Sequence, residues 1–329
     1  MSLSRRSFTL SLAATGLLPA ALRPARAAGR RTLTVASLLA ADKPETRIWH
    51  RIRDLVEARL PGRFAFRIVG NAALGGEKEV AEGIRLGSID ASLSTVSALS
   101  GWVPEAEILD LPFLFRDRAH VARVLAGPLG ADLKARFAAQ DFVVLGTINY
   151  GARHLLAKFP ATALSDVAGR RIRVIQSPLH AALWRALGAV PTPLPITETY
   201  NALKTGVVDM MDLTKSAYAG FRLYEVVPCL IETAHIWATG VVYVSRAFWQ
   251  GLSPDEQAVF AEAGREGAAD FDRLMEADET ASMAAAKAAG GRVFAPEDRA
   301  AWVARAETVW QSAAPRLGGM EKIRAIAKG

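Results

Sequence analysis

Apolar positions follow two different spacings along the first half of the chain. Short unbroken apolar runs, typical of buried strands, alternate with segments in which apolar residues recur every three or four positions, typical of helices. Residues 33–38, 64–69 and 89–93 have the first pattern, and residues 44–60 and 77–86 have the second. This order of strand, helix, strand, helix and strand predicts a parallel sheet covered by helices.

A second series of the same kind follows. The patterns predict strands at 142–148, 171–175, 207–211 and 241–244, with a short extended piece at 192–194, and helices at 117–139, 178–187 and 198–204. The sequence therefore predicts two α/β units rather than one.

One helix is predicted to be far longer than the others. Ser253 and Glu256 form a capping-box pattern around Pro254, and no further proline interrupts the chain before Gly290. A helix over 253–289 would extend for roughly 54 Å, which exceeds the span of one small domain. We therefore expect this helix to bridge two lobes.

The N-terminal 27 residues have the pattern of an export signal. Arg5 and Arg6 precede a short apolar stretch, and Ala25-Arg26-Ala27 resembles a cleavage site. The arginine pair followed by x-Phe-x-Leu resembles the twin-arginine signal. The alternative is a basic arm that stays attached. We expect cleavage, a periplasmic mature protein, and export by the twin-arginine route.

Composition and charge narrow the function classes. The chain has 329 residues, 51% of them apolar, and a formal charge of +7, of which the first 27 residues contribute four arginines. The mature chain is only mildly basic and lacks a basic stripe interleaved with aromatics, so we expect no nucleic-acid partner. A single cysteine, Cys229, forms no internal disulfide. The five histidines lack metal-ligand spacing, and nucleotide-binding and nucleophile-elbow motifs are absent, so we expect no cofactor and no metal.

Several short motifs resemble, in order and spacing, those of the solute-binding proteins of tripartite ATP-independent periplasmic (TRAP) transporters. They are LGGE (74–77), GSID (87–90), LPFLF (111–115), GAR (151–153), DVAGRRIRV (166–174), GAVPTP (188–193), ETYNALKTGVVD (198–209) and YEV (224–226). The resemblance implies a two-lobed periplasmic binding protein fold of mainly parallel sheets flanked by helices, with crossing strands, a bridging helix and a ligand cleft between the lobes.

The resemblance also implies how the chain is divided. The signal peptide would cover 1–27, and lobe I would begin with 28–150. Lobe II would begin with 151–235. A crossing strand and the long helix, 236–278, would rejoin lobe I, and 279–329 would return to lobe II.

Two arginines match the family's carboxylate-binding positions. Arg173 falls where the family arginine forks onto the ligand carboxylate, a geometry that the planar guanidinium favours. Its alternative is a solvated strand residue. Arg153 matches a second family arginine, with a structural salt bridge as the alternative.

Weaker matches fall at Glu77, Thr95, Gln176 and His235. The alternative to ligand binding is that Glu77 only favours the start of its helix, and that His235 is a buried core histidine.

The segment Asp212-Leu213-Thr214 departs from the family, because Leu213 replaces an asparagine that holds polar ligand groups. Ile196 likewise replaces an aromatic residue. With Met211, these changes predict a cleft that is less polar at that end and a smaller or more apolar acid than a sugar acid. Asp212 keeps an acidic group there, which could meet a hydroxyl, an amine or a cation.

We therefore expect a periplasmic solute-binding subunit that captures an organic acid and delivers it to the small and large subunits of a membrane permease. It is not expected to be an enzyme. The alternatives are a receptor of the same fold that feeds a sensor protein, and a periplasmic hydrolase or lyase. Neighbouring permease genes would favour the first, and product formation would favour the last.

Overall fold

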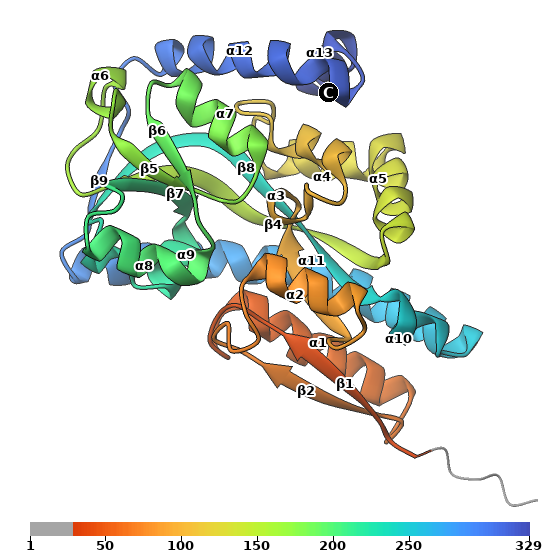
Figure 1. Ribbon diagram of the computed structural model, residues 1–329. Helices are drawn as coiled ribbons and strands as arrows, with labels where there is room; N and C mark the ends of the chain where they lie inside the picture. Colours follow the sequence, from red (N-terminus) through yellow and green to blue (C-terminus); the bar gives the residue numbers. More distant parts are fainter. Residues whose placement is uncertain (1–28) are drawn as a thin grey trace, which may run out of the picture.

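The computed structural model describes residues 29–329, so the predicted signal peptide at 1–27 lies outside the described residues (Figure 1). The strands join one nine-stranded mixed sheet in the order β2-β1-β3-β8-β4-β7-β5-β6, with β9 beside β8. They are β1 (Arg31–Ala36), β2 (Phe64–Val69), β3 (Ala91–Thr95), β4 (Phe142–Ala157), β5 (Arg171–Val174), β6 (Val190–Pro193), β7 (Met210–Thr214), β8 (Cys229–Ser245) and β9 (Arg292–Phe294).

The sheet order divides the molecule into two α/β lobes. Parallel strands β1, β2 and β3 form the sheet of one lobe, and parallel strands β5, β6 and β7 form that of the other. The long strands β4 and β8 pair antiparallel with each other, β8 also pairs with β3, and β4 also pairs with β7. Both long strands therefore pass from one lobe into the other (Figure 1). The two-lobed α/β fold predicted for the chain is confirmed.

The crossing strands are much longer than the predicted strands at 142–148 and 241–244. Polar residues such as Asn149, His154 and His235 interrupt the apolar pattern of the crossing strands outside the predicted ranges. The structure nevertheless buries all three, because the two strands lie between both lobes. Asn149 Oδ1 and the Nδ1 atoms of both histidines have partners inside the protein, whereas Asn149 Nδ2 has none among the described residues. Register shifts between β4 and β8 occur at three places, one of them between Asn149 and Gly151.

Helices cover both faces of the sheet. They are α1 (Pro44–Arg59), α2 (Glu77–Arg85), α3 (Val96–Leu99), α4 (Arg118–Ala126), α5 (Pro128–Ala139), α6 (Leu164–Val167), α7 (Pro178–Ala186), α8 (Ile196–Lys204), α9 (Lys215–Gly220), α10 (Arg246–Gln250), α11 (Pro254–Ala288), α12 (Arg299–Leu317) and α13 (Met320–Lys328), with short 3-10 turns η1 (Pro104–Asp110) and η2 (Leu223–Glu225). The single helix predicted over 117–139 is wrong: Pro128 cannot donate a backbone hydrogen bond and disfavours helical geometry at Gly127, so α4 ends and α5 begins there.

The bridging helix α11 is present as predicted and runs for 35 residues from the capping box at Ser253. It packs against α1 in one lobe, along β4, and against α9 in the other lobe (Figure 1). Two glycines permit the close approach: a Cβ on Gly264 would lie 2.4 Å from the Cβ of Leu145, and one on Gly267 would lie 2.8 Å from Ile52. The helix is therefore a shared structural element of both lobes.

Apolar side chains gather in three buried clusters. One lies under α1 and α11, one under α8 and α9, and the largest extends across η1, α5, α7 and α12. None of the helices within residues 29–329 combines the length and the apolar character that crossing a bilayer would require.

Candidate ligand-binding site

A narrow pocket lies where the two lobes face each other. The space between its walls amounts to about 570 Å³, of which about 60 Å³ is open to the centre of a water molecule. The pocket walls come from the segment after β1, from α1, α2 and β3 of one lobe, from the crossing strands, and from β5, β7, α8 and α9 of the other. Its lining residues are Leu38, Leu39, Glu45, Glu77, Leu93, Thr95, Tyr150, Arg153, Arg173, Ile175, Ile196, Leu213, Thr214, Ala217, Phe221 and Ala238. The carboxyl ends of parallel strands β1, β3 and β5 thus meet at one cleft.

Arg173 is a buried cation without a carboxylate partner. Its side chain is 2% exposed, and its Nε donates a 2.8 Å hydrogen bond to the carbonyl of Leu194, which fixes the plane of the guanidinium. The two terminal nitrogens donate to no atom within residues 29–329. Burial, followed by repulsion from Arg153, lowers the pKa of Arg173 to about 10. The guanidinium stays charged at neutral pH and is preorganised for a bidentate anion.

Arg153 is held by Asp212. Its Nε lies 2.8 Å from Asp212 Oδ2, and one terminal nitrogen donates to the Asp212 carbonyl at 2.7 Å. Burial disfavours both charges. The attraction of Arg153 and a 3.1 Å contact from His235 Nε2 nevertheless hold the pKa of Asp212 well below its usual range. Arg153 therefore lines the pocket as half of a neutral pair, whereas Arg173 carries an unmatched charge.

The residues Asp212 and His235 lie behind the pocket wall rather than in it. Both are fully buried, and His235 Nδ1 lies 2.7 Å from the Thr233 hydroxyl. Burial lowers the pKa of His235 despite the Asp212 carboxylate. Through these contacts Asp212 and His235 position Arg153, and Asp212 is not exposed to a ligand in the pocket.

Glu77 faces the pocket with both oxygens occupied. The backbone N–H of Thr95 donates to Oε1 at 2.5 Å, and the Thr95 hydroxyl lies 3.2 Å from Oε2. Burial raises the pKa of Glu77, although these hydrogen bonds and the two arginines oppose the shift. Glu77 and Thr95 thus form one fixed polar unit beside the arginines.

The apolar wall of the pocket includes residues at which the sequence differs from the family pattern. Ile196 and Leu213 line the pocket, together with Thr214. Met211 does not: it lies two residues before Leu213 on the same face of β7 and is fully buried in the cluster under α8 and α9. Gln176 lies in a small adjoining pocket that shares Glu77, Arg173 and Ile196.

Sequence reasoning missed Glu45 and Tyr150. Glu45 is the second residue of α1 and is 4% exposed, and its Oε2 has no hydrogen-bond partner among the described residues. Burial raises the pKa of Glu45 to about 7. The one available signal was its place just after strand β1, since the segments that follow strands form the cleft.

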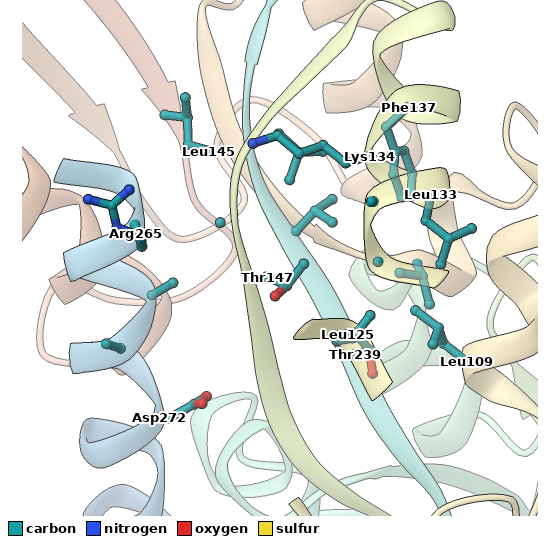
Figure 2. Close-up of a pocket in the computed structure, with 18 residues that line it drawn as sticks. Leu109, Leu125, Leu133, Lys134, Phe137, Leu145, Thr147, Thr239, Arg265 and Asp272 are labelled. Carbon is teal, nitrogen blue, oxygen red and sulfur yellow. The ribbon is translucent and has the colours of Figure 1, made fainter. Parts of the chain in front are cut away.

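A second cavity, larger than the pocket, lies between α5 and α11. Figure 2 shows Lys134, Leu133 and Phe137 on α5 to one side, Arg265 and Asp272 on α11 to the other, and Leu145 and Thr147 on β4 passing between them. Lys134 and Arg265 are both exposed, so water screens their charges. The buried, unmatched cation is in the interlobe pocket, which makes that pocket the candidate ligand site. Within residues 29–329, no cluster of histidine, cysteine and acidic side chains is suited to a metal ion.

The sequence profile of "Bacterial extracellular solute-binding protein, family 7" matches residues 35–316. The chain belongs to this family. A solute-binding protein from Verminephrobacter eiseniae is 33% identical over 250 residues, which cover 76% of this chain and 75% of the relative.

Solved structures agree with this assignment. A TRAP periplasmic solute-binding protein from Bradyrhizobium in complex with galacturonate is 32% identical, with a TM-score of 0.85 over 91% of this chain and 98% of that one. Another from Bordetella, with density assigned to pantoate, is 29% identical, with a TM-score of 0.87 over 91% and 99% of the two chains. The fold and the function as a solute-binding protein of the TRAP type follow from these matches.

Proposed function

We propose that the protein binds the carboxylate of a small organic acid on Arg173, inside the interlobe pocket. The observation that carries the proposal is the unmatched charge of a guanidinium that is 2% exposed and held in plane by Leu194. A buried cation without a partner is costly, and an anion that forms two charged hydrogen bonds relieves that cost. Arg153, Glu77 and Thr95 would complete the polar end of the site.

The lobes are proposed to follow the predicted division of the chain. Residues 28–150 and 236–278 would form lobe I, and residues 151–235 and 279–329 would form lobe II. The register shift between Asn149 and Gly151 supports the first boundary. A ligand that contacts both lobes stabilises the arrangement in which they are close, since only that arrangement offers both sets of contacts.

The ligand is proposed to be smaller and less polar than a uronic acid. Leu213 and Ile196 occupy wall positions where the family pattern has an asparagine and an aromatic residue, and Leu38, Leu93 and Phe221 extend the apolar lining. The Bordetella relative supports this direction, since pantoate is a short acid with an apolar, doubly methylated body. The Bradyrhizobium relative takes a uronate, so uronates belong in the test as the contrary case.

The loaded protein is proposed to deliver its solute to the small and large subunits of a membrane permease and to carry out no chemistry itself. Export by the twin-arginine route, with cleavage after Ala27, completes the proposal. The arginine pair at Arg5 and Arg6 supports it.

Two arginine substitutions test the carboxylate site. A thermal-shift screen of organic acids, uronates included, first identifies ligands, because binding to the folded state raises stability. Calorimetry then follows the best of them. Arg173→Lys keeps the charge but loses the paired donors, and we expect about tenfold weaker binding; for Arg173→Ala we expect about a hundredfold.

Arg171 provides the matched control on the same strand. Its side chain is half exposed and paired with Asp209 at 3.2 Å, so Arg171→Ala should leave affinity nearly unchanged. Near-normal affinity of folded Arg173→Ala protein would remove Arg173 from the site. Tight uronate binding would contradict the proposed ligand size without affecting the arginine.

A further inference from the structure

We propose that the solute is a hydroxy acid and that Glu45, in the same pocket as Arg173, binds its hydroxyl. The inference rests on the proposed function and specifies the substrate class of the same site. Solutes of this class have a carboxylate, a short apolar body and a hydroxyl group.

Glu45 is a buried acid whose second oxygen lacks a partner. Its side chain lines the pocket, is 4% exposed, and leaves Oε2 without a hydrogen bond among the described residues. Nearly all buried polar atoms in proteins have a partner, and an unpaired one is costly. A ligand that supplies the missing hydrogen bond removes this cost. Glu45 therefore favours solutes that have a polar group beside it.

The pocket combines these polar groups with a mainly apolar lining. Glu45, Arg153 and Arg173 all line it, and most of the other lining side chains are aliphatic or aromatic. The charges of Arg153 and Arg173 act on Glu77, whereas those that act on Glu45 are Lys43, Asp278 and Glu77. A solute that contacts both Arg173 and Glu45 would therefore combine two polar groups with an apolar body.

The charge of the site favours a hydroxyl over an ammonium group. Arg153 and Asp212 neutralise each other, and a bound carboxylate would neutralise Arg173, so no unmatched positive charge remains in the pocket to favour an ionised Glu45. A second negative charge on Glu45 is then unfavourable, and the proton stays on it. A neutral carboxyl both donates and accepts a hydrogen bond, as a hydroxyl does.

The groups around Glu45 agree with a neutral acid. Lys43 is already bound to Asp278 at 3.1 Å and to the Ser282 hydroxyl, and Asp278 also accepts from Ser216. Asp278 and Glu77 both disfavour a negative charge on Glu45. Tyr150 on β4 lines the same pocket and is itself neutral, since burial raises the pKa of that phenol well above its usual value.

Paired acids that differ by one terminal hydroxyl test the inference by calorimetry. The pairs are pantoate with 2-hydroxy-3,3-dimethylbutanoate, and 4-hydroxybutanoate with butanoate. The hydroxylated member should bind the wild-type protein about tenfold more tightly or better. Glu45→Met should abolish this preference and leave the affinity for the other member unchanged, which also shows that the variant is folded.

Glu45→Gln distinguishes the effect of the titratable proton of Glu45 from the effect of its side-chain shape. The amide keeps a donor and an acceptor but does not titrate, so we expect it to retain the preference for the hydroxyl. Wild-type affinity for the hydroxy acid should fall about fivefold from pH 6 to pH 8, as Glu45 loses its proton, whereas Glu45→Gln should show no such fall. Glu57→Gln, on the exposed face of the same helix, serves as the control and should behave as wild type.

The outcomes distinguish this inference from the proposed function. Equal binding within both pairs, binding of neither pair, or a preference that survives Glu45→Met would overturn the role of Glu45. Affinity that rises with pH would instead indicate an ionised Glu45 and an ammonium group. The proposed function itself fails only if no carboxylate in the screen binds the wild-type protein, or if Arg173→Ala binds acids normally.

Discussion

The Asp212 carboxylate is the residue on which the buried charges of the cleft depend. It accepts from Arg153 at 2.8 Å and lies 3.1 Å from His235, and none of the three side chains is more than about 3% exposed. Without it, Arg153 would add a second unmatched cation close to Arg173. The pair thus leaves one charge, and one only, for the ligand to neutralise.

Substitution of Asp212 should therefore destabilise the protein strongly. Asp212→Ala leaves the buried Arg153 charge without a partner, and we expect a loss of about 3–5 kcal/mol in the free energy of unfolding at pH 7. Urea unfolding followed by circular dichroism measures it. Arg153→Met combined with Asp212→Leu removes both charges and should cost less than Asp212→Ala alone.

The pH dependence of this loss follows from the depressed pKa of Asp212. A carboxyl whose pKa is lower in the folded than in the unfolded state adds stability above its unfolded pKa of about 4, and this stability is lost as the pH falls through the folded value. The difference between wild type and Asp212→Ala should thus shrink from pH 7 to pH 3. A constant difference would show that lost packing, rather than charge, is responsible.

Individual residues differ in how far the sequence predicts their place. Arg173 and Arg153 stand in short motifs with fixed spacing, and both line the pocket. Asp212 and His235 stand outside these motifs and lie one layer deeper, because the exact register of the paired strands decides which side chains reach the cleft. Glu45 resembles any acid at a helix start until packing buries it.

At the scale of elements, local patterns located most helices but not the crossing strands. Helix signals such as the Ser253 capping box are local, so α11 was predictable from about 36 residues alone. Strands β4 and β8 are fixed by pairing between residues far apart in the chain, for example Arg153 with Ile236 and Thr214. The polar residues at their centres become compatible with burial only when both lobes are present.

The crossing strands and α11 predict lobe closure. Within residues 29–329, β4, β8 and α11 are continuous segments that contact elements of both lobes, the strands by pairing and α11 through α1 and α9. Small-angle scattering should show a smaller radius of gyration with saturating ligand than without it. Arg173→Ala protein under the same conditions is the control and should stay unchanged. Equal radii for wild type in both states would contradict a hinged receptor or indicate one that is already closed.

For the whole molecule, we predict delivery to the periplasm through the arginine pair. Arg5→Lys with Arg6→Lys keeps the charge of the N-terminus but loses the twin-arginine signal, so the precursor should accumulate in the cytoplasm. Cell fractionation measures this, and N-terminal sequencing of the wild-type product should begin near Ala28. Normal periplasmic delivery of the double variant would remove the twin-arginine route and leave the solute-binding function untouched.

The position of β8 between β3 and β4 has a consequence for biosynthesis. Ala91 pairs with Val244, so the edge of β3 stays open until nearly three quarters of the chain has left the ribosome. The same strand closes β4, so neither lobe completes its sheet while the chain is still short. Contacts so distant in sequence form slowly, and open strand edges invite association with other chains. A product truncated before Cys229 would thus expose two unpaired edges at once, which makes incomplete chains far more prone to aggregate than the finished protein.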